Sequence, residues 1–191
     1  MAEGEIDRIE PLFVVGPDVP EVERLVAALG AAGVRTGRDE CRTRPFDDVG
    51  RRYAAALTEQ SGGADYGLSA IDPGLRTRIA EAIELAAKAH LGAASLAGSW
   101  AAGSGRLLSF VPFLAAIFPR MRLLMVIPEA PDPAASSVAA LAARILSGHC
   151  HAIRGSLISS DPSGAVAAAL KRWAGLDDPP PGASPGAPGP W

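Results

Sequence analysis

The stretch that decides the fold runs from Pro11 to Val34 and reads PLFVVG-PDVPEVE-RLVAALGAAGV. Its first part, Pro11–Gly16, is a short apolar run that is rich in β-forming residues and ends in glycine, which is typical of a buried strand. Its last part, Glu21–Gly33, has apolar residues at helical spacing and closes on glycines, which predicts a helix. A strand followed directly by a glycine and a helix has the outline of a phosphate-binding loop.

The turn of this loop, Gly16–Glu23, lacks the residues that hold a phosphate. A working loop offers N–H donors, small residues for close backbone approach and usually a Lys or Arg. Here Pro17 and Pro20 remove two N–H donors. Three carboxylates then place negative charge where a phosphate would sit: Asp18, Glu21 and Glu23. Carboxylates in a first helical turn stabilise the helix itself. The residues alone therefore favour an ordinary capped strand-to-helix turn.

Further apolar runs alternate with helical patterns along the rest of the chain. Helices are predicted at Val49–Gln60, Leu75–Leu91 (with Pro73 at its start), Leu107–Phe118, Ala134–Leu146 and Ser163–Leu176. Strands are predicted at Ala93–Leu96, Arg122–Ile127 and Cys150–Ile153, and loops at 35–50 and 61–74. Buried strands separated by helices predict an α/β fold with three layers, α/β/α, around a central parallel sheet.

The composition indicates one soluble globular domain. The chain has 191 residues, of which 48% are hydrophobic and 20% charged, which is enough apolar material for a real core. We expect a polar tail at 1–10, the α/β domain at 11–176 and a disordered Pro/Gly-rich tail at 177–191. The formal net charge of −3 argues against a nucleic-acid partner, which usually requires a basic patch.

The sequence also gives expectations for the cellular location of the protein and for metal binding. The N-terminus has no signal-peptide pattern, and the longest apolar run is far short of the ~20 residues that a membrane span needs, so a cytoplasmic protein is expected. Cys41 and Cys150 fit neither a disulfide framework nor a zinc site and are interpreted as reduced thiols. His149 and His151 would share one face of a strand, but no third ligand follows at a known spacing, so no metal site is predicted.

Residues 11–37 resemble the start of a PAPS-dependent sulfotransferase of the bacterial type, a P-loop-type fold. In that family the strand is followed by a turn of the form PRSGT or PKSGT and then by a helix that ends in an LGV segment. An ungapped match places Val19 at the basic position of the turn. It places Pro20, Glu21 and Val22 at the Ser, Gly and Thr positions.

A second segment, 106–139, resembles the family's next block, which runs from a KDPR turn through an apolar helix ending in FP to a strand and an RDP turn. Arg106 matches the arginine of the first turn, and Phe118-Pro119 match the helix end. Pro128-Glu129-Ala130 stand at the position of the family's RDP turn, so the arginine that binds the 3′-phosphate in the family is missing from this chain. Ser136 matches the family's serine that contacts the same phosphate. A third segment, 154–176, resembles the family's C-terminal ending at Asp161-Pro162 and Gly175-Leu176.

The resemblance implies where a nucleotide would bind. Gly16, Arg106 and Ser136 would contact its phosphates. The alternative for Arg106 is one half of a surface ion pair. Trp100, in GSWAAGSGR, would stack on the adenine or pack as an ordinary aromatic residue. His90 is a candidate catalytic base, against the alternative of a surface or supporting histidine.

The sequence leaves three functions open. The first is a divergent sulfotransferase-like protein with impaired or absent PAPS binding, which needs no cofactor and acts as a binding or regulatory partner. The second is an active sulfotransferase that moves a sulfonate from PAPS, as co-substrate, to a hydroxyl or amine acceptor. The third is an unrelated α/β interaction or regulatory module. The acceptor and the protein partner are unidentified, and Leu107–Phe118 would either be buried in the core or form a homo-oligomer face.

Overall fold

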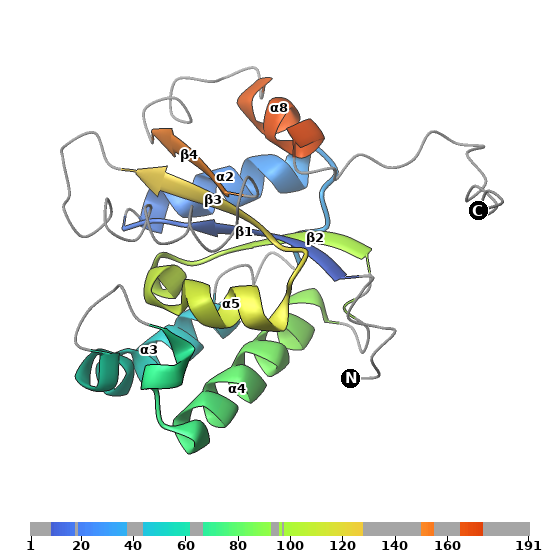
Figure 1. The fold of residues 1–191 in the computed structure, drawn as a ribbon. Coiled ribbons are helices and arrows are strands. Elements are labelled where there is room, and N and C mark those ends of the chain that lie inside the picture. Colours follow the sequence, from blue (N-terminus) through green and yellow to red (C-terminus); the bar gives the residue numbers. More distant parts are fainter. Residues whose placement is uncertain are drawn as a thin grey trace, which may run out of the picture.

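The structure is a computed structural model, and it describes residues 9–17, 19–37, 44–61, 67–92, 96, 98–127, 150–154 and 165–173. Figure 1 shows the arrangement of the elements. In chain order they are β1 (Ile9–Val15), α2 (Val19–Ala31), α3 (Arg44–Ser61), the short 3₁₀ helix η2 (Leu68–Ala70), α4 (Pro73–Leu91), β2 (Gly98–Gly103), the 3₁₀ helix η3 (Gly105–Phe110), α5 (Val111–Ile117), β3 (Arg122–Ile127), β4 (Cys150–Arg154) and α8 (Ala165–Trp173).

The described strands form one parallel sheet in the order β2-β1-β3-β4. β1 lies inside the sheet, with Val14 opposite Gly103 of β2 and opposite Leu124 of β3. Parallel neighbours must be joined by crossover connections, and these connections carry helices onto the faces of the sheet.

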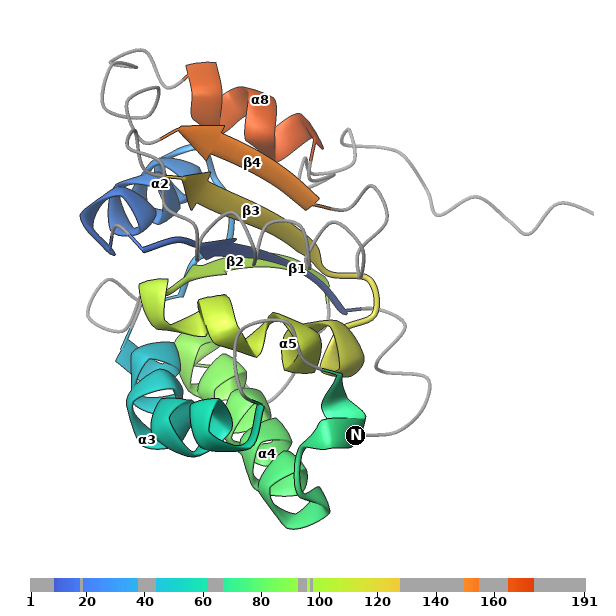
Figure 2. The same cartoon turned by 60° about the vertical axis from the view of Figure 1, so that its left-hand side comes forward.

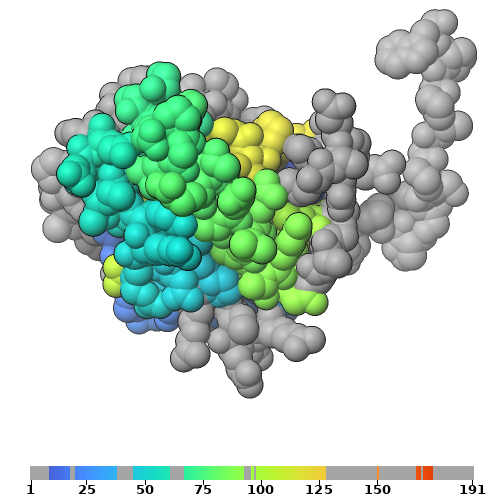
Figure 3. All heavy atoms as spheres, turned by 90° about the horizontal axis from the view of Figure 1, so that it is seen from below, coloured from blue at the N-terminus to red at the C-terminus, as the bar shows by residue number. Residues whose placement is uncertain are grey.

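Helices cover both faces of this sheet, as Figures 1 and 2 show. One face packs against α3, α4, η3 and α5, and the other packs against α2 and α8. Figure 3 shows α3 and α4 side by side on the outside of the first face. The prediction of a three-layer α/β/α fold with a central parallel sheet is therefore confirmed.

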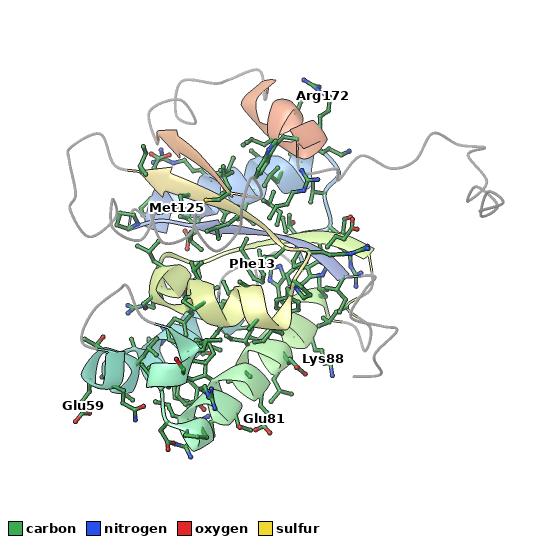
Figure 4. All side chains as sticks on the ribbon, viewed as in Figure 1. Phe13, Glu59, Glu81, Lys88, Met125 and Arg172 are labelled. Atoms are coloured by element: carbon green, nitrogen blue, oxygen red, sulfur yellow. The ribbon has the colours of Figure 1, made fainter. Side chains whose placement is uncertain are left out.

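The side chains of β1 alternate between the two helical layers, as they must in a strand that is buried on both faces. Phe13 and Val15 enter the core under α3, α4 and α5, whereas Leu12 and Val14 enter the core under α2 and α8. Figure 4 shows Phe13 between the sheet and the α5 layer, while Glu81 of α4 points away from the core.

The ring of Phe13 is the centre of an aromatic cluster. Its centroid lies 5.7 Å from that of Phe46, 5.5 Å from that of Trp100 and 5.6 Å from that of Phe118. All four side chains are fully buried. Such pairs stabilise a fold by about 0.5–1.5 kcal/mol each beyond the area they bury, so this cluster ties β1, α3 and β2 together.

The helix predicted at Leu75–Leu91 is confirmed and begins at Pro73. The side chain of Asp72 accepts a hydrogen bond from the Leu75 N–H at 2.9 Å, and Pro73 occupies the first helical position. Gly92 ends the helix in the left-handed conformation with φ 58°. None of the described helices is both long enough and apolar enough to cross a membrane.

One sequence prediction is wrong, and one strand was not predicted. Of the strand expected at Ala93–Leu96, residues 93–95 lie outside the described residues, whereas Leu96 is described and is not in a strand. The strand β2, at Gly98–Gly103, was not predicted. Its small residues look like a turn, but Gly103 is where α2 packs: a Cβ on Gly103 would lie 2.5 Å from Val26 Cγ2. Residues 44–48, expected in a loop, already belong to α3, because Phe46 is buried in register with Val49 and Tyr53.

The remaining strand and helix predictions agree closely. The strand predicted at Arg122–Ile127 has these bounds, and the strand predicted at Cys150–Ile153 extends to Arg154. The apolar run 107–118 forms η3 and α5, and the last predicted helix runs from Ala165 to Trp173. The helix predicted at 134–146 and the tail at 177–191 lie outside the described residues.

Candidate functional site

The chain leaves the carboxyl ends of β1 and β2 toward opposite faces of the sheet. After β1 it enters α2 on one face, and after β2 it enters η3 and α5 on the other. In open α/β sheets, ligands bind outside the carboxyl ends of the strands where neighbouring connections diverge in this way. The candidate site is therefore the edge formed by Gly16–Pro17 and Gly103–Arg106.

Gly16 is held against the backbone of β3. A Cβ built on it would collide with the carbonyl oxygen of Val126 and would lie 3.0 Å from the Val126 Cβ. The residue is buried. The packing of the sheet thus requires a glycine at this position whether or not a phosphate binds nearby.

The first turn of α2 carries a carboxylate that faces partly into the protein. Glu21 Oε1 accepts a hydrogen bond from Arg24 Nη1 at 2.6 Å. The side chain of Glu21 is only 14% exposed, whereas that of Arg24 is 57% exposed. Pro20, just before it, has no N–H to donate. Negative charge at this end of α2 interacts favourably with the helix dipole and so stabilises the helix, but it opposes the approach of an anion.

The end of β2 is joined to β1 and α3 through Ser104. Its N–H donates to the Val14 carbonyl at 3.1 Å, and its hydroxyl accepts from the Arg106 N–H at 3.1 Å. The same hydroxyl donates to Oδ1 of Asp47, in the first turn of α3. Ser104 is 1% exposed. Ser104 is therefore the N-terminal cap of η3 and a link to α3.

Arg106 is the cation that remains at this edge. A Cβ on Gly50 of α3 would collide with the Arg106 Cβ, so the stem of the arginine lies against α3. The residue as a whole is exposed. Among the described residues no carboxylate forms an ion pair with it. The surface ion pair considered for Arg106 is therefore not found in the described part of the chain.

Trp100 and His90 lie in the core rather than at this edge. Trp100 is fully buried, and its Nε1 donates to the Leu96 carbonyl at 3.1 Å. A fully buried ring has no open face on which an adenine could stack. His90 is also fully buried, with Nε2 3.0 Å from the Ala101 carbonyl oxygen. A base for an acceptor hydroxyl must reach the substrate, so this position does not suit His90 for that role.

The other sequence candidates are only partly described. Ser136, the 128–130 turn, Cys41 and His149 lie outside the described residues. Cys150 begins β4 and is half-buried, and this burial raises the pKa of its thiol. Within the described parts of the chain, no three His, Cys, Asp or Glu side chains come close enough to hold a metal ion.

Sequence reasoning missed the partly buried hydrogen bond between Ser104 and Asp47. A serine directly before a Gly-Arg pair is a normal helix-capping pattern, and that signal could have identified Ser104. Asp47 could not be found in the same way, because residues 35–50 were expected to be a loop. No protein-family model matches this chain, and no curated protein sequence matches it either.

Proposed function

We propose that this chain is a divergent sulfotransferase-like protein of the P-loop type that has lost productive PAPS binding and serves as a binding or regulatory partner. The first turn of α2 supports this best. Pro20 offers no N–H there, and the Glu21 carboxylate is held in place by Arg24. A phosphate that approached this helix would meet a carboxylate where it needs donors and a cation.

The fold supports the ancestry that this proposal assumes. A parallel sheet and a strand–glycine–helix turn are both required for it, and the chain has both. The contact between Gly16 and Val126 also explains why the glycine would persist after phosphate binding was lost. Sulfuryl transfer would need several cations and donors at once, and losing one such group typically costs on the order of 10²–10³ in rate.

Calorimetric titration with PAP, the product nucleotide of sulfuryl transfer, tests this function. We expect no saturable binding, that is, a dissociation constant weaker than about 1 mM, which corresponds to a binding free energy of about −4 kcal/mol. Micromolar binding by the unaltered chain would overturn the proposal.

A variant that carries the residues of the family's turn tests whether the turn of this chain causes the expected lack of PAP binding. We expect the triple variant Val19→Lys, Pro20→Ser, Glu21→Gly to bind PAP more tightly than the unaltered chain, because it regains a cation, an N–H and close backbone approach. Glu23→Gln is the matched control, since it removes one nearby negative charge without rebuilding the turn. Equal affinities for the triple variant and the control would place the cause elsewhere.

The exposure of Arg106 is the one observation that favours an active transferase instead. If PAP binds the unaltered chain and Arg106→Ala abolishes that binding, the nucleotide site lies at the edge between β1 and β2. Transfer of a labelled sulfonate from PAPS to a hydroxyl or amine acceptor would then be the next measurement.

A further inference from the structure

The outer side of α4 carries an exposed leucine. The inner side of this helix sends Ile79, Ile83 and Leu91 into the core. Leu85 lies outside this core with 66% of its side chain exposed, and among the described residues it is the one large apolar side chain that is exposed. Figure 3 shows α4 on the outside of the molecule, with α3 beside it.

Two opposite charges flank this leucine. A single exposed leucine is common on soluble proteins, so the charges around it carry the inference. Glu81 lies one turn before Leu85 and Lys88 lies one turn after it, and residues at this spacing share one side of a helix. Figure 4 shows the side chains of Glu81 and Lys88 on the outside of α4. Among the described residues, neither of them forms an ion pair.

An acidic residue before the leucine and a basic residue after it form a pattern that is complementary to itself. Glu81 lies about 6 Å before Leu85 along the helix axis, and Lys88 lies about 4.5 Å after it. A second α4, turned by 180° so that Leu85 meets Leu85, places Glu81 of each copy beside Lys88 of the other. Parallel helices would place like charges side by side, which is unfavourable. The charges therefore select an antiparallel pair.

The other charged residues of the helix are compatible with this pairing. Arg78 lies two turns before Leu85, level with Gly92 at the C-terminal end of the second helix, where the helix dipole favours a cation. Glu84 lies about 100° around the helix from Leu85, at the side of the contact. Arg76 donates a hydrogen bond to a carbonyl of η2.

We propose that two copies of this chain associate through an antiparallel contact between their α4 helices. Leu85 lies at the centre of the contact, and an ion pair between Glu81 and Lys88 lies on each side of it. The apolar run 107–118, the other candidate for a face between copies, is mostly buried in the core. The contact involves no nucleotide, so it does not depend on the function proposed above.

Sedimentation equilibrium of the full chain tests the dimer. One pair of helices makes a small interface, so we expect a reversible dimer with a dissociation constant on the order of 100 µM. Leu85→Gln should raise this constant at least about tenfold, because each dimer loses two leucines from the centre of its contact. A monomer at about 1 mM, or a dimer that Leu85→Gln leaves unchanged, would overturn the proposal.

Two charge variants test the arrangement of the helices, and they keep the proposal testable if Leu85→Gln does not fold. Glu81→Lys and Lys88→Glu each bring like charges together, so each variant alone should dimerise about tenfold more weakly. An equal mixture of the two should form a heterodimer at least as tightly as the unaltered chain dimerises. Added salt should weaken this heterodimer. A mixture that associates as weakly as its components contradicts an antiparallel contact.

Glu59→Lys is the matched control. Glu59 is exposed on α3, and Figure 4 shows it away from Glu81 and Lys88. This variant changes the net charge as Glu81→Lys does, yet it should dimerise like the unaltered chain. Its mixture with Lys88→Glu has the same net charges as the test mixture but still brings two carboxylates together, so it should associate more weakly. Equal association of the two mixtures would mean that net charge alone drives it, and the proposal would fail.

Discussion

Gly16 illustrates how one residue can satisfy a motif and a packing constraint together. In the sequence it stands where a phosphate-binding turn begins. In the structure it faces the Val126 carbonyl at close range, so any side chain would push β1 and β3 apart. The packing of the sheet therefore explains the glycine, whether or not a phosphate binds beside it.

Gly16→Ala tests this packing explanation. We expect it to lower the free energy of unfolding by about 1–3 kcal/mol, the usual cost of forcing extra atoms into a close-packed interior. Chemical denaturation measures the change. Gly67→Ala is the control, because Gly67 is exposed and a Cβ there would meet only Ser69 Oγ at 3.5 Å. Similar losses in both variants would contradict the packing argument.

The fate of Trp100 and His90 shows the limit of single-residue prediction. Both residue types occur in ligand sites and in cores, and their sequence neighbours are small or apolar in either case. What decides their role is the aromatic cluster around Phe13, whose members come from separate elements. That proximity depends on the tertiary fold and has no local sequence signal.

Between elements, the hydrogen bond from Ser104 to Asp47 joins η3 to α3 at the edge of the sheet. It connects residues that are far apart in sequence, and Ser104 is buried. A buried hydroxyl that pairs with a carboxylate stabilises the fold only while both partners are present. Ser104 therefore holds the backbone at the end of β2, next to the exposed Arg106.

Ser104→Ala should lower the free energy of unfolding by about 1–3 kcal/mol, because it leaves the Asp47 oxygen and the Arg106 N–H without this partner. Thr58→Ala is the control, since the exposed Thr58 hydroxyl bonds only to the Ala54 carbonyl of its own helix, and we expect a change within about 0.5 kcal/mol. A double-mutant cycle with Asp47→Ala, which removes the acceptor of the Ser104 hydroxyl, measures the coupling. Strict additivity would mean that the two side chains do not act together.

Elements were predictable where their own residues carry the signal. β3 is a continuous apolar run, and α4 has Asp72, Pro73 and Gly92 at its ends, so both were placed correctly. β2 was not predicted because its glycine and alanine residues have low strand propensity, and α2 packs so closely on Gly103 that a side chain there would collide with Val26. The start of α3 was not predicted because the buried Phe46 stands among polar residues, which do not show the apolar spacing of a helix.

For the whole molecule, α8 completes the layer formed with α2. Arg122 of β3 donates a hydrogen bond to the Trp173 carbonyl, and its guanidinium carbon lies 5.6 Å from the centroid of the Trp173 ring. Lys171 Nζ donates to the Ala32 carbonyl, just beyond the end of α2, at 2.9 Å. These polar contacts therefore hold α8 in place beside the core, and the buried side chain of Leu170 anchors the helix within it.

Arg122→Ala should loosen α8 more than the rest of the fold. We expect a loss of about 1–2 kcal/mol, since the variant removes a charge-assisted hydrogen bond and a cation–π contact. Hydrogen exchange should show the largest loss of protection within Ala165–Trp173. Arg120→Ala is the control, because its ion pair with Glu10 is exposed and worth little. An equal effect of both variants on α8 would contradict this assignment.

The position of β1 inside the parallel sheet has a consequence for how the chain is made. β1 leaves the ribosome well before its sheet partners β2 and β3, which begin only at Gly98 and Arg122. Until those residues are synthesised, the β1 side chains have no sheet to join. Contacts between such distant segments slow folding, and an unpaired apolar strand is prone to aggregate. We therefore expect α2, which follows β1 directly, to give β1 its early apolar contacts through Val22, Leu25 and Val26.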